Sequence, residues 1–484
     1  MTLTPPPTIS AARSIVVASA LAIATSLSGC AMLPDVGQPG MMKAPAEYES
    51  AASFSAPAAN WPAERWWQSY GDAQLVTLID EALRDAPDMA AAAARMRRAE
   101  AYLKVSGSTL LPQVSANASV AEQKLSYNYL TPRTMTPGGW QDYGIGTINL
   151  NWEIDFWGKN RAAVSAATSQ REASRAEAAL VQLNLAAAIA INYADLAKLH
   201  ALRDTAVRTV EIRSKTVELF NERFQNGMET QGSVSEAKAR LAGAQGELLS
   251  IEEQIGLTCN RLASLAGAGP DRALSIKRPK VDLGGHFGLP PELAVNLLGR
   301  RPDVIMARLL AEAQSHRIAQ KKAEFYPNVN LSAFIGVQSL GLNNLTKAGS
   351  DIGGIGPAVS LPLFTAGRLQ GELRATSAAY DEMVANYNAT VTHALEEVAG
   401  AALSIKALAR QVEKAEEAVR EAAEAHRVAR DRYEGGLANF IEVLYAEDVL
   451  LNNQRSLTAL KSRALTLDIT LQRALGGGYQ FKNS

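Results

Sequence analysis

The chain has 484 residues, of which 47% are hydrophobic and 20% are charged, and its formal net charge is −1. This near-neutral balance excludes a global field that would favour nucleic acid, and the length is sufficient for two or more domains. No uninterrupted apolar run reaches the roughly 18 residues of a mature membrane-spanning helix, so a membrane role would require strands or a lipid anchor.

The N-terminus predicts export and lipidation. Arg13 precedes the apolar run SIVVASALAIATSL, which is followed by Ser-Gly-Cys. A short apolar core with small residues at its end is typical of a secretory signal peptide, here residues 1–29. The LSGC ending resembles the bacterial lipobox, which implies lipidation of Cys30, for example with palmitate, as the first mature residue. A plain signal peptide followed by a chance cysteine is the alternative.

The segment after Cys30 predicts a lipidated tether that leads to a helix. Residues 30–60 are rich in Pro, Ala, Gly and Ser, a composition typical of linkers. A helix is predicted over residues 72–107, and three tryptophans are expected to pack at its start: Trp61, Trp66 and Trp67. Because lipid would occupy Cys30, the other cysteine, Cys259, has no disulfide partner. We expect it to be a small packed residue.

Two stretches predict unusually long helices, over residues 158–226 and 367–434. In the second, apolar residues recur at alternating spacings of four and three from Tyr380 to Val412, which indicates a coiled-coil seam. A helix of about 69 residues would be roughly 100 Å long. Shorter helices over 72–107 and 229–266 together have a similar length, so two short helices could stack beside one long helix.

The clearest strand pattern lies between Pro327 and Arg368. The segments PNVNLSAFIGVQSL and DIGGIGPAVSLPLF alternate apolar residues with small or polar ones. Alternation over about ten residues predicts strands with one apolar and one polar face, as in transmembrane barrels. An ordinary hairpin of a soluble sheet is the alternative. Long alanine-rich helical patterns flank both segments, and a similar helix–strand–strand–helix order occurs earlier in the chain.

The two halves of the chain match each other. Four pairs of residues correspond, the first two pairs 215 residues apart and the last two 209 residues apart: Pro87 and Pro302, Pro112 and Pro327, Gly158 and Gly367, Gly227 and Gly436. The difference of six residues falls between the paired strands, in the first hairpin. Repetition on this scale indicates a duplicated architecture.

The repeat sets the predicted domain boundaries. We expect the first structural repeat over residues 61–270, an equatorial connector over 271–288, the second repeat over 289–475 and a C-terminal tail over 476–484. Four strands cannot close into a barrel alone. Two chains would supply eight strands with a filled interior, whereas three or four chains would leave a lumen. A membrane-spanning chain of this kind must therefore oligomerise to pair its edge strands.

Several motifs resemble the TolC-type outer-membrane channels, in order over residues 60–478: WWQSYGDAQLVTLIDEAL, WEIDFWGKNR, LPLFTAGR and RYEGGLANFIEVLYAE. The lipobox points to the lipoprotein branch similar to OprM and the NodT-type factors. The resemblance implies a mainly α fold with β: a helical α-barrel plus four transmembrane β-strands per chain, which complete a twelve-stranded barrel in a homotrimer. It also implies the outer-membrane exit duct of a multidrug-resistance pump, which conducts small molecules passively.

The implied partners are a periplasmic adaptor, an inner-membrane transporter of the RND type and outer-membrane lipid. The implied gate lies where the long helices end, at Gly227 and at Gly435 and Gly436, because glycine tolerates the left-handed geometry of a helix stop.

The resemblance assigns gate roles by position. It places Ile441 on an apolar ring, Tyr433 on an aromatic position that bonds across the closed tip, and Glu442 on an acidic ring. Tyr445 stands where the family usually has an aspartate, and Ser233 stands at a first-half position that is often acidic. Neither Tyr445 nor Ser233 supplies the negative charge that the family usually has at these positions. That charge is expected instead from one of three acids: Glu236, Glu442 or Glu447.

The sequence does not favour an enzyme. The five histidines are scattered, and the chain has neither the HExxH zinc motif nor a GxxxxGK[ST] phosphate loop nor a GxSxG nucleophile elbow. We therefore expect no metal and no cofactor other than covalent lipid on Cys30. Two alternatives remain open: a structural coiled-coil lipoprotein of the periplasm, and a channel of the same fold that serves type I protein secretion. A periplasmic hydrolase is a more distant third.

Overall fold

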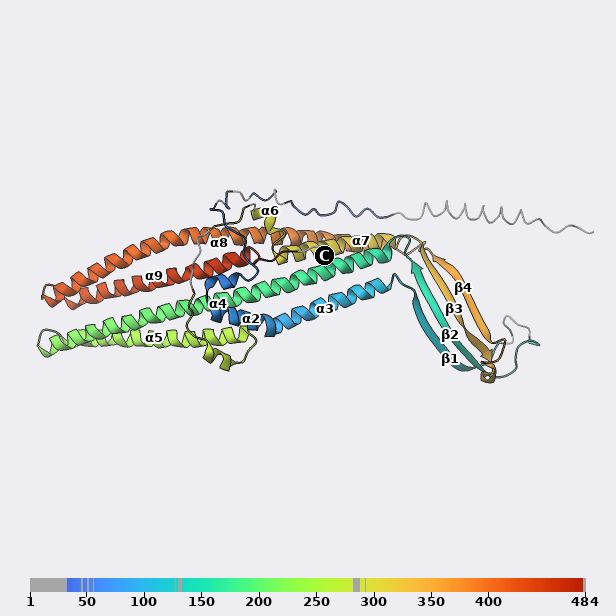
Figure 1. The fold of residues 1–484 in the computed structure, drawn as a ribbon, viewed down its shortest axis with the longest axis horizontal. Coiled ribbons are helices and arrows are strands. Elements are labelled where there is room, and N and C mark those ends of the chain that lie inside the picture. The colour runs from blue at the N-terminus through green and yellow to red at the C-terminus, as the bar shows by residue number, and fades with distance from the viewer. Residues whose placement is uncertain are drawn as a thin grey trace, which may run out of the picture. The chain divides into compact units, whose positions relative to one another are not determined.

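The computed structural model describes residues 33–44, 47–49, 52–54, 56–126, 128, 133–281, 288–291 and 293–481. The predicted signal peptide and Cys30 lie outside these residues. The chain divides into two compact units (Figure 1). The strand unit comprises the described residues through Met41, with Arg97–Glu172 and Arg308–Ala385, and the helix unit comprises the remainder.

The strand unit contains a four-stranded antiparallel sheet in the order β1-β2-β3-β4 (Figure 1). Its strands are β1 Gln113–Gln123, β2 Gln141–Ile154, β3 Asn328–Leu340 and β4 Asp351–Ser360. The predicted paired strands are therefore confirmed. β2 pairs with β3, with Ile154 opposite Val329, although 173 residues lie between the end of β2 and the start of β3, so this pairing joins the two repeats. At this seam a Cβ on Gly336 would collide with the backbone of Gly146, which explains the glycine.

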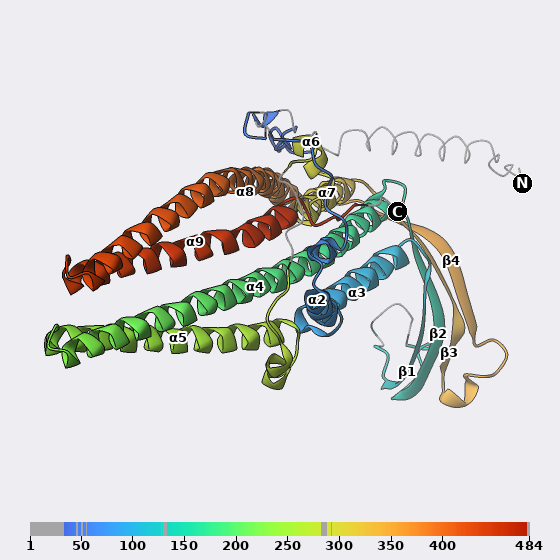
Figure 2. The same cartoon turned by 60° about the vertical axis from the view of Figure 1, so that its left-hand side comes forward.

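Eight α-helices follow the repeat pattern among the described residues: α2 Ala73–Asp85, α3 Pro87–Ser108, α4 Lys159–Gln225, α5 Gln231–Leu265, α6 Leu293–Leu297, α7 Pro302–Ala323, α8 Arg368–Glu434 and α9 Phe440–Ala474. Short 3-10 turns lie at Trp66–Tyr70, Pro270–Ser275 and Leu342–Asn344. Within the helix unit, α4 lies beside α5 and α8 lies beside α9, as two hairpins (Figure 2). The two long helices have 67 residues each, close to the predicted length.

The predicted continuous helix over 72–107 is wrong. Two helices, α2 and α3, are separated by Ala86, whose φ of −65° and ψ of 136° are extended. Pro87 causes this break, because the proline ring disfavours helical geometry in the residue before it. Asp72 caps α2 by accepting hydrogen bonds from the backbone N–H groups of Gln74 and Leu75.

One core cluster of the helix unit forms around Trp66 and Trp67, which are each 3% exposed. Their rings meet edge to face at a centroid distance of 5.7 Å and an interplanar angle of 82°, as expected for aromatic pairs. Cys259 is buried and free beside this core, which confirms the expectation of a packed residue. Among the described residues only α4 is long and apolar enough to cross a membrane by composition, and its apolar residues Leu185, Ile189 and Leu196 are core residues of this cluster.

The predicted seam of α8 lies in a second core of the helix unit. Tyr387, Val391, Val398 and Ala402 are all buried there. The seam does not continue as predicted, however. Ala409 is exposed, whereas its neighbour Leu408 is 6% exposed. Leu408 follows the buried residues Tyr387, Ala394 and Ala401 at spacings of seven, so the buried face keeps the heptad, and the predicted Ala409 lies one residue beyond it.

One described segment of the predicted tether lies against α8. In the strand unit, Val36 packs against Leu369 and Leu373, and the backbone N–H of Gly40 donates to Asp381 at 2.7 Å. A Cβ on Gly40 would come within 3.5 Å of the Asp381 Cα atom, so this segment of the chain approaches the backbone of α8 closely. We call residues 33–44 the strap. It is bound to the helix rather than free as a flexible linker.

Candidate functional site

The two hairpin tips have the same turn. Gly227 and Gly436 are left-handed, with φ of 71° and 76°. In each turn the next residue donates its backbone N–H back to the helix at 2.8 Å, Met228 to the Arg223 carbonyl and Leu437 to the Arg432 carbonyl. These bonds form Schellman motifs, which end a helix at a left-handed glycine.

Gly435 differs from the two left-handed glycines. It does not have a positive φ, and its N–H donates to the Asp431 carbonyl at 3.0 Å, which continues the helical bonding of α8. Of the three glycines predicted at the tips, Gly227 and Gly436 are therefore the ones that need glycine for backbone geometry.

The second helix of each hairpin starts at equivalent positions. Thr230 caps α5 by accepting from the Ser233 N–H at 3.3 Å, and Asn439 caps α9 by accepting from the Glu442 N–H at 3.1 Å. With the offset of 209 residues, Ser233 corresponds to Glu442, and Glu236 corresponds to Tyr445. The acidic residue of each pair thus comes from a different repeat.

The gate candidates on α9 are accessible. Ile441 is 59% exposed and Tyr445 is 71% exposed. The Glu442 side chain is 45% exposed, with the Arg432 guanidinium 3.4 Å away. Glu236 on α5 is also 45% exposed, and it pairs with Arg240 at 3.0 Å. These four side chains are therefore accessible near the hairpin tips, and both acids have a basic neighbour.

Ser233 is placed differently, because it is only 1% exposed. Its hydroxyl donates a 2.5 Å hydrogen bond to Glu229. An acid therefore does stand at the first-half tip, four residues before the serine. Sequence reasoning missed Glu229 because it precedes the helix, where no face can be assigned from periodicity.

Glu447 is completely buried. It accepts a hydrogen bond from the Thr216 hydroxyl of α4, and its other oxygen is 3.7 Å from Arg213. Its neighbour Asp448 accepts from Arg213 and Arg240, so this cluster joins α9 to α4 and α5. The expectation that Glu447 supplies charge to an opening is wrong for this conformation, because the carboxyl faces the interior of the helix unit.

Tyr433 is also buried, at 2% exposure. Its ring lies 5.4 Å from the Phe220 ring and 4.5 Å from the Arg223 guanidinium carbon. The Tyr433 hydroxyl has no hydrogen-bond partner among the described residues. Burial raises the pKa of this hydroxyl, and the negative charge of Glu229 raises it further.

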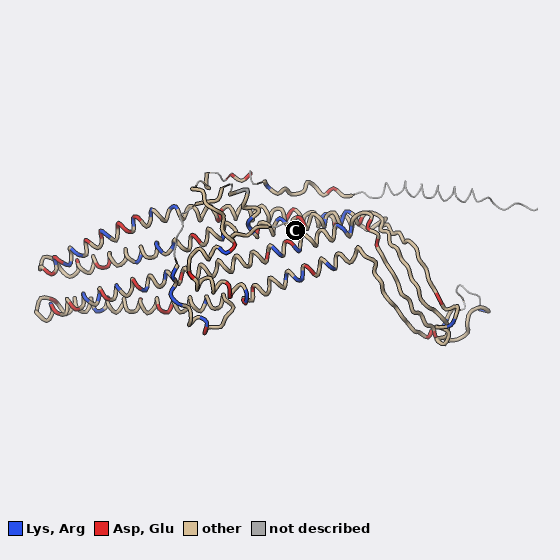
Figure 3. The backbone as a smooth tube through the Cα atoms, in the orientation of Figure 1, with Lys and Arg blue, Asp and Glu red and all other residues tan. Residues whose placement is uncertain are grey.

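The sheet has one apolar face that is open to its surroundings. Six large residues from all four strands lie on the same face by register, and each is at least 55% exposed: Val114, Val120, Ile148, Ile335, Ile355 and Val359. The opposite face carries small polar residues such as Asn149, Asn151 and Ser332. Charged residues lie only near the strand ends (Figure 3). Such a sheet would be unstable in water unless its apolar face were covered.

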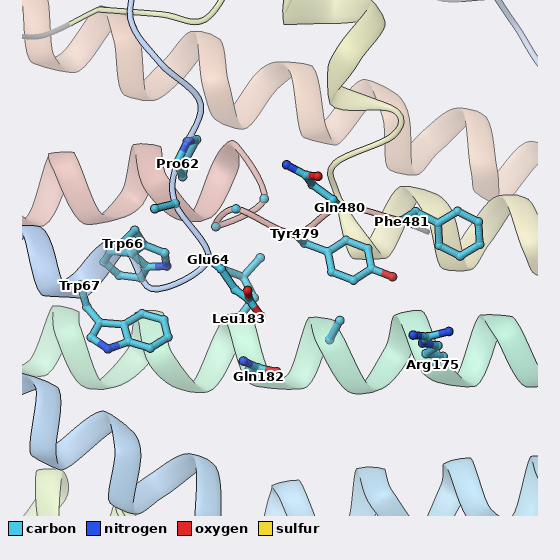
Figure 4. Close-up of a pocket in the computed structure, with 15 residues that line it drawn as sticks. Pro62, Glu64, Trp66, Trp67, Arg175, Gln182, Leu183, Tyr479, Gln480 and Phe481 are labelled. Carbon is cyan, nitrogen blue, oxygen red and sulfur yellow. The ribbon is translucent and has the colours of Figure 1, made fainter. Parts of the chain in front are cut away.

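The helix unit contains a pocket beside the last described residues of the chain. A pocket of about 450 Å³ in the helix unit lies between Trp66 and the C-terminal residues Tyr479 and Phe481 (Figure 4). Its lining contains Glu64, Arg175 and Gln182 but no serine, cysteine or histidine. No group of three or more His, Cys, Asp or Glu residues that could hold a metal occurs in the described ranges.

Comparison with known proteins identifies the fold. The family model described as outer membrane efflux protein matches residues 78–268 and 293–477. The multidrug resistance outer membrane protein MdtP of Escherichia coli K12 is 31% identical, over 96% of this chain and 97% of that protein. The fusaric acid resistance protein FusA of Burkholderia cepacia is 35% identical, over 76% of this chain and 70% of that protein.

Solved structures agree with these matches. The outer membrane protein VceC of Vibrio cholerae superposes with a TM-score of 0.83 at 47% identity, over 87% of this chain and all of that chain. The outer-membrane channel OprN has a TM-score of 0.82 at 24% identity, over 93% of this chain and 99% of that chain, which supports the fold alone. The resemblance to TolC-type channels is thereby confirmed, with the fold class, the outer-membrane location and the role as an efflux exit duct. The chain belongs to the family of outer membrane efflux proteins.

Proposed function

We propose that three copies of this chain form the exit duct of a tripartite efflux pump, with a periplasmic adaptor and an inner-membrane RND-type transporter. The observation that carries this proposal is the exposed apolar face of the sheet together with its open edges, β1 and β4. Lipid would cover the apolar face, and neighbouring copies would pair the edges. Three chains give twelve strands and an open lumen, whereas two give eight and a filled interior.

The oligomer can be tested directly. Native mass spectrometry of the detergent-extracted mature protein is expected to give a trimer, and the trimer is expected to conduct ions in a planar bilayer. Its migration on a gel should change on heating. A monomeric, water-soluble protein without conductance would refute the duct.

We also propose that the hairpin tips form its gate. Ile441, Glu442 and Tyr445 are exposed at the start of α9 and would border the opening, with Glu236 and Glu229 as the acids of the first repeat. Opening would be an outward swing of the tip helices that adaptor contacts stabilise. Ile441→Ala and Glu442→Ala are expected to raise the resting conductance in planar bilayers. Unchanged conductance in both variants would remove these residues from the gate.

The adaptor would dock at the same tips, where Met228 and Leu437 are 57% and 74% exposed. Cysteines introduced at these two positions are suitable for crosslinking in cells, because the native Cys259 is buried. Capture of a periplasmic adaptor of an RND-type pump is the expected result. Capture of an adaptor from a protein-secretion system would favour the type I secretion role of the same fold.

We propose that Cys30 carries the lipid. Val36 lies beside Leu369, next to the start of α8, and its apolar cluster also contains Phe325, three residues before the start of β3. Val36 is six positions after Cys30, a stretch of chain that spans at most about 20 Å when extended. The acyl chains would thus reach the membrane that holds the strands. Labelled palmitate is expected to enter the wild-type protein but not Cys30→Ser, and labelling of both would disprove this site.

A further inference from the structure

The polar face of the sheet carries a large aromatic side chain near its middle. Phe334 lies at the midpoint of β3, opposite Asn149 of β2 and opposite Gly354 of β4. Residues that lie directly opposite each other on paired strands point to the same face. Phe334 therefore faces the same side as Asn149, away from the apolar face that carries Ile335. Because Phe334 is 43% exposed, its ring borders the space on the polar side of the sheet.

Gly354 lies directly beneath the Phe334 ring. A Cβ atom on Gly354 would be 2.9 Å from the Cε1 atom of the ring and 3.3 Å from its Cζ atom. Carbon atoms that are not bonded to each other pack at about 3.5–4.0 Å, so even the methyl group of alanine does not fit below the ring. The ring thus lies across the backbone of β4 rather than standing away from the sheet. A ring placed over a facing glycine is a known way to cover the bare backbone of an edge strand.

The first repeat does not have this combination. Phe334 corresponds to Ser119 at the offset of 215 residues that relates the first strands of the two hairpins, and Gly354 corresponds to Ile145 at the offset of 209 that relates the second strands. Ser119 and Ile145 also lie opposite each other. The ring with a glycine beneath it therefore belongs to the second repeat, and each chain would contribute it once at this level.

From this arrangement we infer that Phe334 and Gly354 set the free width of the duct within the membrane, and thereby the size of solute that passes. We call these two residues the wall pair. The inference rests on the proposed trimeric duct, in which lipid covers the apolar face and the polar face lines the lumen. Twelve strands about 4.8 Å apart and tilted by about 40° enclose a cylinder about 24 Å across, measured between backbones. Three rings that stood up from this wall would narrow the passage, whereas three rings that lie flat leave it open.

A side chain at position 354 is expected to move the ring and not the strand. The backbone of β4 is paired with β3 from Asp351 to Ser360, and its other edge would pair with a neighbouring copy. The Phe334 ring, in contrast, can turn about its side-chain bonds to another staggered position. Gly354→Ala is therefore expected to push the ring off the wall and into the lumen.

The next glycine on the same face supplies a matched control. Gly356 lies two residues further along β4, opposite Ser332, and a Cβ atom there would have open space around it. Neither Gly354 nor Gly356 has a positive φ, so the backbone accepts alanine at both positions. Gly356→Ala adds the same methyl group to the same strand without touching the ring.

The test is the rate at which thiol reagents added outside intact cells modify a cysteine beyond the wall pair. Asn330→Cys and Gln338→Cys each place a thiol on the polar face four residues from Phe334, the first toward the helices and the second toward the hairpin loop. A reagent that enters from the loop end must pass the ring to reach position 330 but not to reach position 338. Fluorescein maleimide serves as the bulky reagent and methanethiosulfonate ethylammonium as the small one. The chain without either substitution gives the background, and its Cys259 is buried.

The bulky reagent is expected to report the width. Gly354→Ala should slow its reaction at position 330 by at least about threefold and leave the reaction at position 338 within about twofold, because only the first site lies beyond the narrowed part of the lumen. Gly356→Ala should leave both rates unchanged. The small reagent should react at position 330 at similar rates in all variants, since it passes the raised rings.

Phe334→Ala tests whether the ring is responsible. If Gly354→Ala acts by raising the ring, it will have no effect in a chain that also carries Phe334→Ala. Slowing that persists without the ring would overturn the inference, as would equal slowing by Gly356→Ala, because any added methyl group would then be sufficient. An unchanged rate in Gly354→Ala would overturn it as well, since the ring would not limit the passage.

The same measurements distinguish this inference from the proposed function. If both thiols react with the bulky reagent and neither rate depends on Gly354→Ala, the duct stands and the wall pair is wrong. If neither thiol reacts even with the small reagent, the polar face does not line a water-filled passage and the proposed duct itself fails. Heat-modifiable migration checks assembly. If Gly354→Ala loses the assembled form, the glycine serves folding of the sheet rather than the width of the duct, and the inference is likewise overturned.

Discussion

The Thr216 hydroxyl donates a 2.7 Å hydrogen bond to Glu447, and this contact joins α4 to α9 inside the helix unit. Glu447 has no exposed surface. Its second oxygen lacks a hydrogen-bond partner among the described residues, and the nearest cation there is Arg213 at 3.7 Å. Burial is the largest influence on this carboxyl and raises its pKa. A buried carboxyl with one unsatisfied oxygen favours the neutral form.

This environment predicts how stability depends on pH. Because the pKa of Glu447 is raised in the folded state, its contribution to the free energy of unfolding is fully present below the ordinary value of 4.5 and is lost as pH rises through the folded pKa. Glu447→Gln mimics the neutral form and should be about 1–2 kcal/mol more stable than the wild type at pH 8. Thermal unfolding of the detergent-extracted protein at pH 5 and pH 8 measures this. If Glu447→Gln instead lost the same stability at pH 5 and at pH 8, the folded protein would need the charged form of Glu447.

Asp448→Asn is the control for the charged side of this cluster. Asp448 accepts hydrogen bonds from both Arg213 and Arg240, and its side chain is 34% exposed. Its replacement leaves two partly buried guanidinium groups with fewer partners and should destabilise at both pH values. The two adjacent acids are therefore expected to have opposite effects at pH 8.

The pKa of Asp72 is shifted downward, opposite to the shift of Glu447. It caps α2 and also accepts hydrogen bonds from the Lys280 N–H and the Tyr193 hydroxyl, each at 2.7 Å. Burial raises the pKa of Asp72, but the hydrogen bonds outweigh burial and the net shift is downward. The stability that it contributes is present above its ordinary value of 3.8 and is lost as pH falls through the lower folded pKa.

Asp72→Ala is accordingly expected to cost about 2–4 kcal/mol at pH 7, since it removes a cap and leaves two buried donors without an acceptor. Thermal unfolding near neutral pH gives the comparison. Asp80→Asn is the matched control, because its ion pair with Arg65 is about half exposed and should change stability by about 0.5 kcal/mol or less. Similar losses in the two variants would contradict the role of Asp72.

Arg301 is a buried cation with several partners. Its guanidinium bonds Asp303 at 2.6 Å, Glu397 at 2.7 Å and the Ala474 carbonyl at 3.0 Å, and the residue is 6% exposed. Arg301→Met would leave two shielded carboxylates with less compensation and should cost about 3–5 kcal/mol. Arg84→Met, at an exposed pair with Asp85, should leave the unfolding temperature unchanged. The prediction fails if the two variants unfold together.

The glycines of the second tip provide a backbone test. Gly436→Ala forces an L-residue into left-handed geometry and should destabilise by about 1 kcal/mol. Gly435 has helical hydrogen bonding, so Gly435→Ala should leave the stability unchanged or raise it slightly. Hydrogen exchange of the amides of α8 near Glu434 would detect the difference locally, with faster exchange only in Gly436→Ala. Faster exchange in both variants would mean that the turn needs both glycines.

The sequence predicted the elements that depend on local pattern. Alternation located the strands, Gly227 and Gly436 marked the helix ends, and the repeat gave the order of elements. Side-chain orientation was harder to predict. Ser233 and Glu442 occupy equivalent positions, yet one is buried and the other is half exposed, because Glu229 and the neighbouring helices differ around them. The burial of Glu447 likewise depends on Thr216, 231 residues away, which periodicity within one helix cannot reveal.

The open order of the sheet also has a consequence for the cell. Since β1 and β4 each expose an unpaired row of backbone groups within one chain, a lone copy cannot enter hydrocarbon without leaving those groups unsatisfied. Insertion and association must therefore be one concerted event whose yield depends on the local concentration of newly exported copies. A defective copy that still pairs its strands would spoil every complex that it joins, so damaging alleles should act dominantly over the wild type.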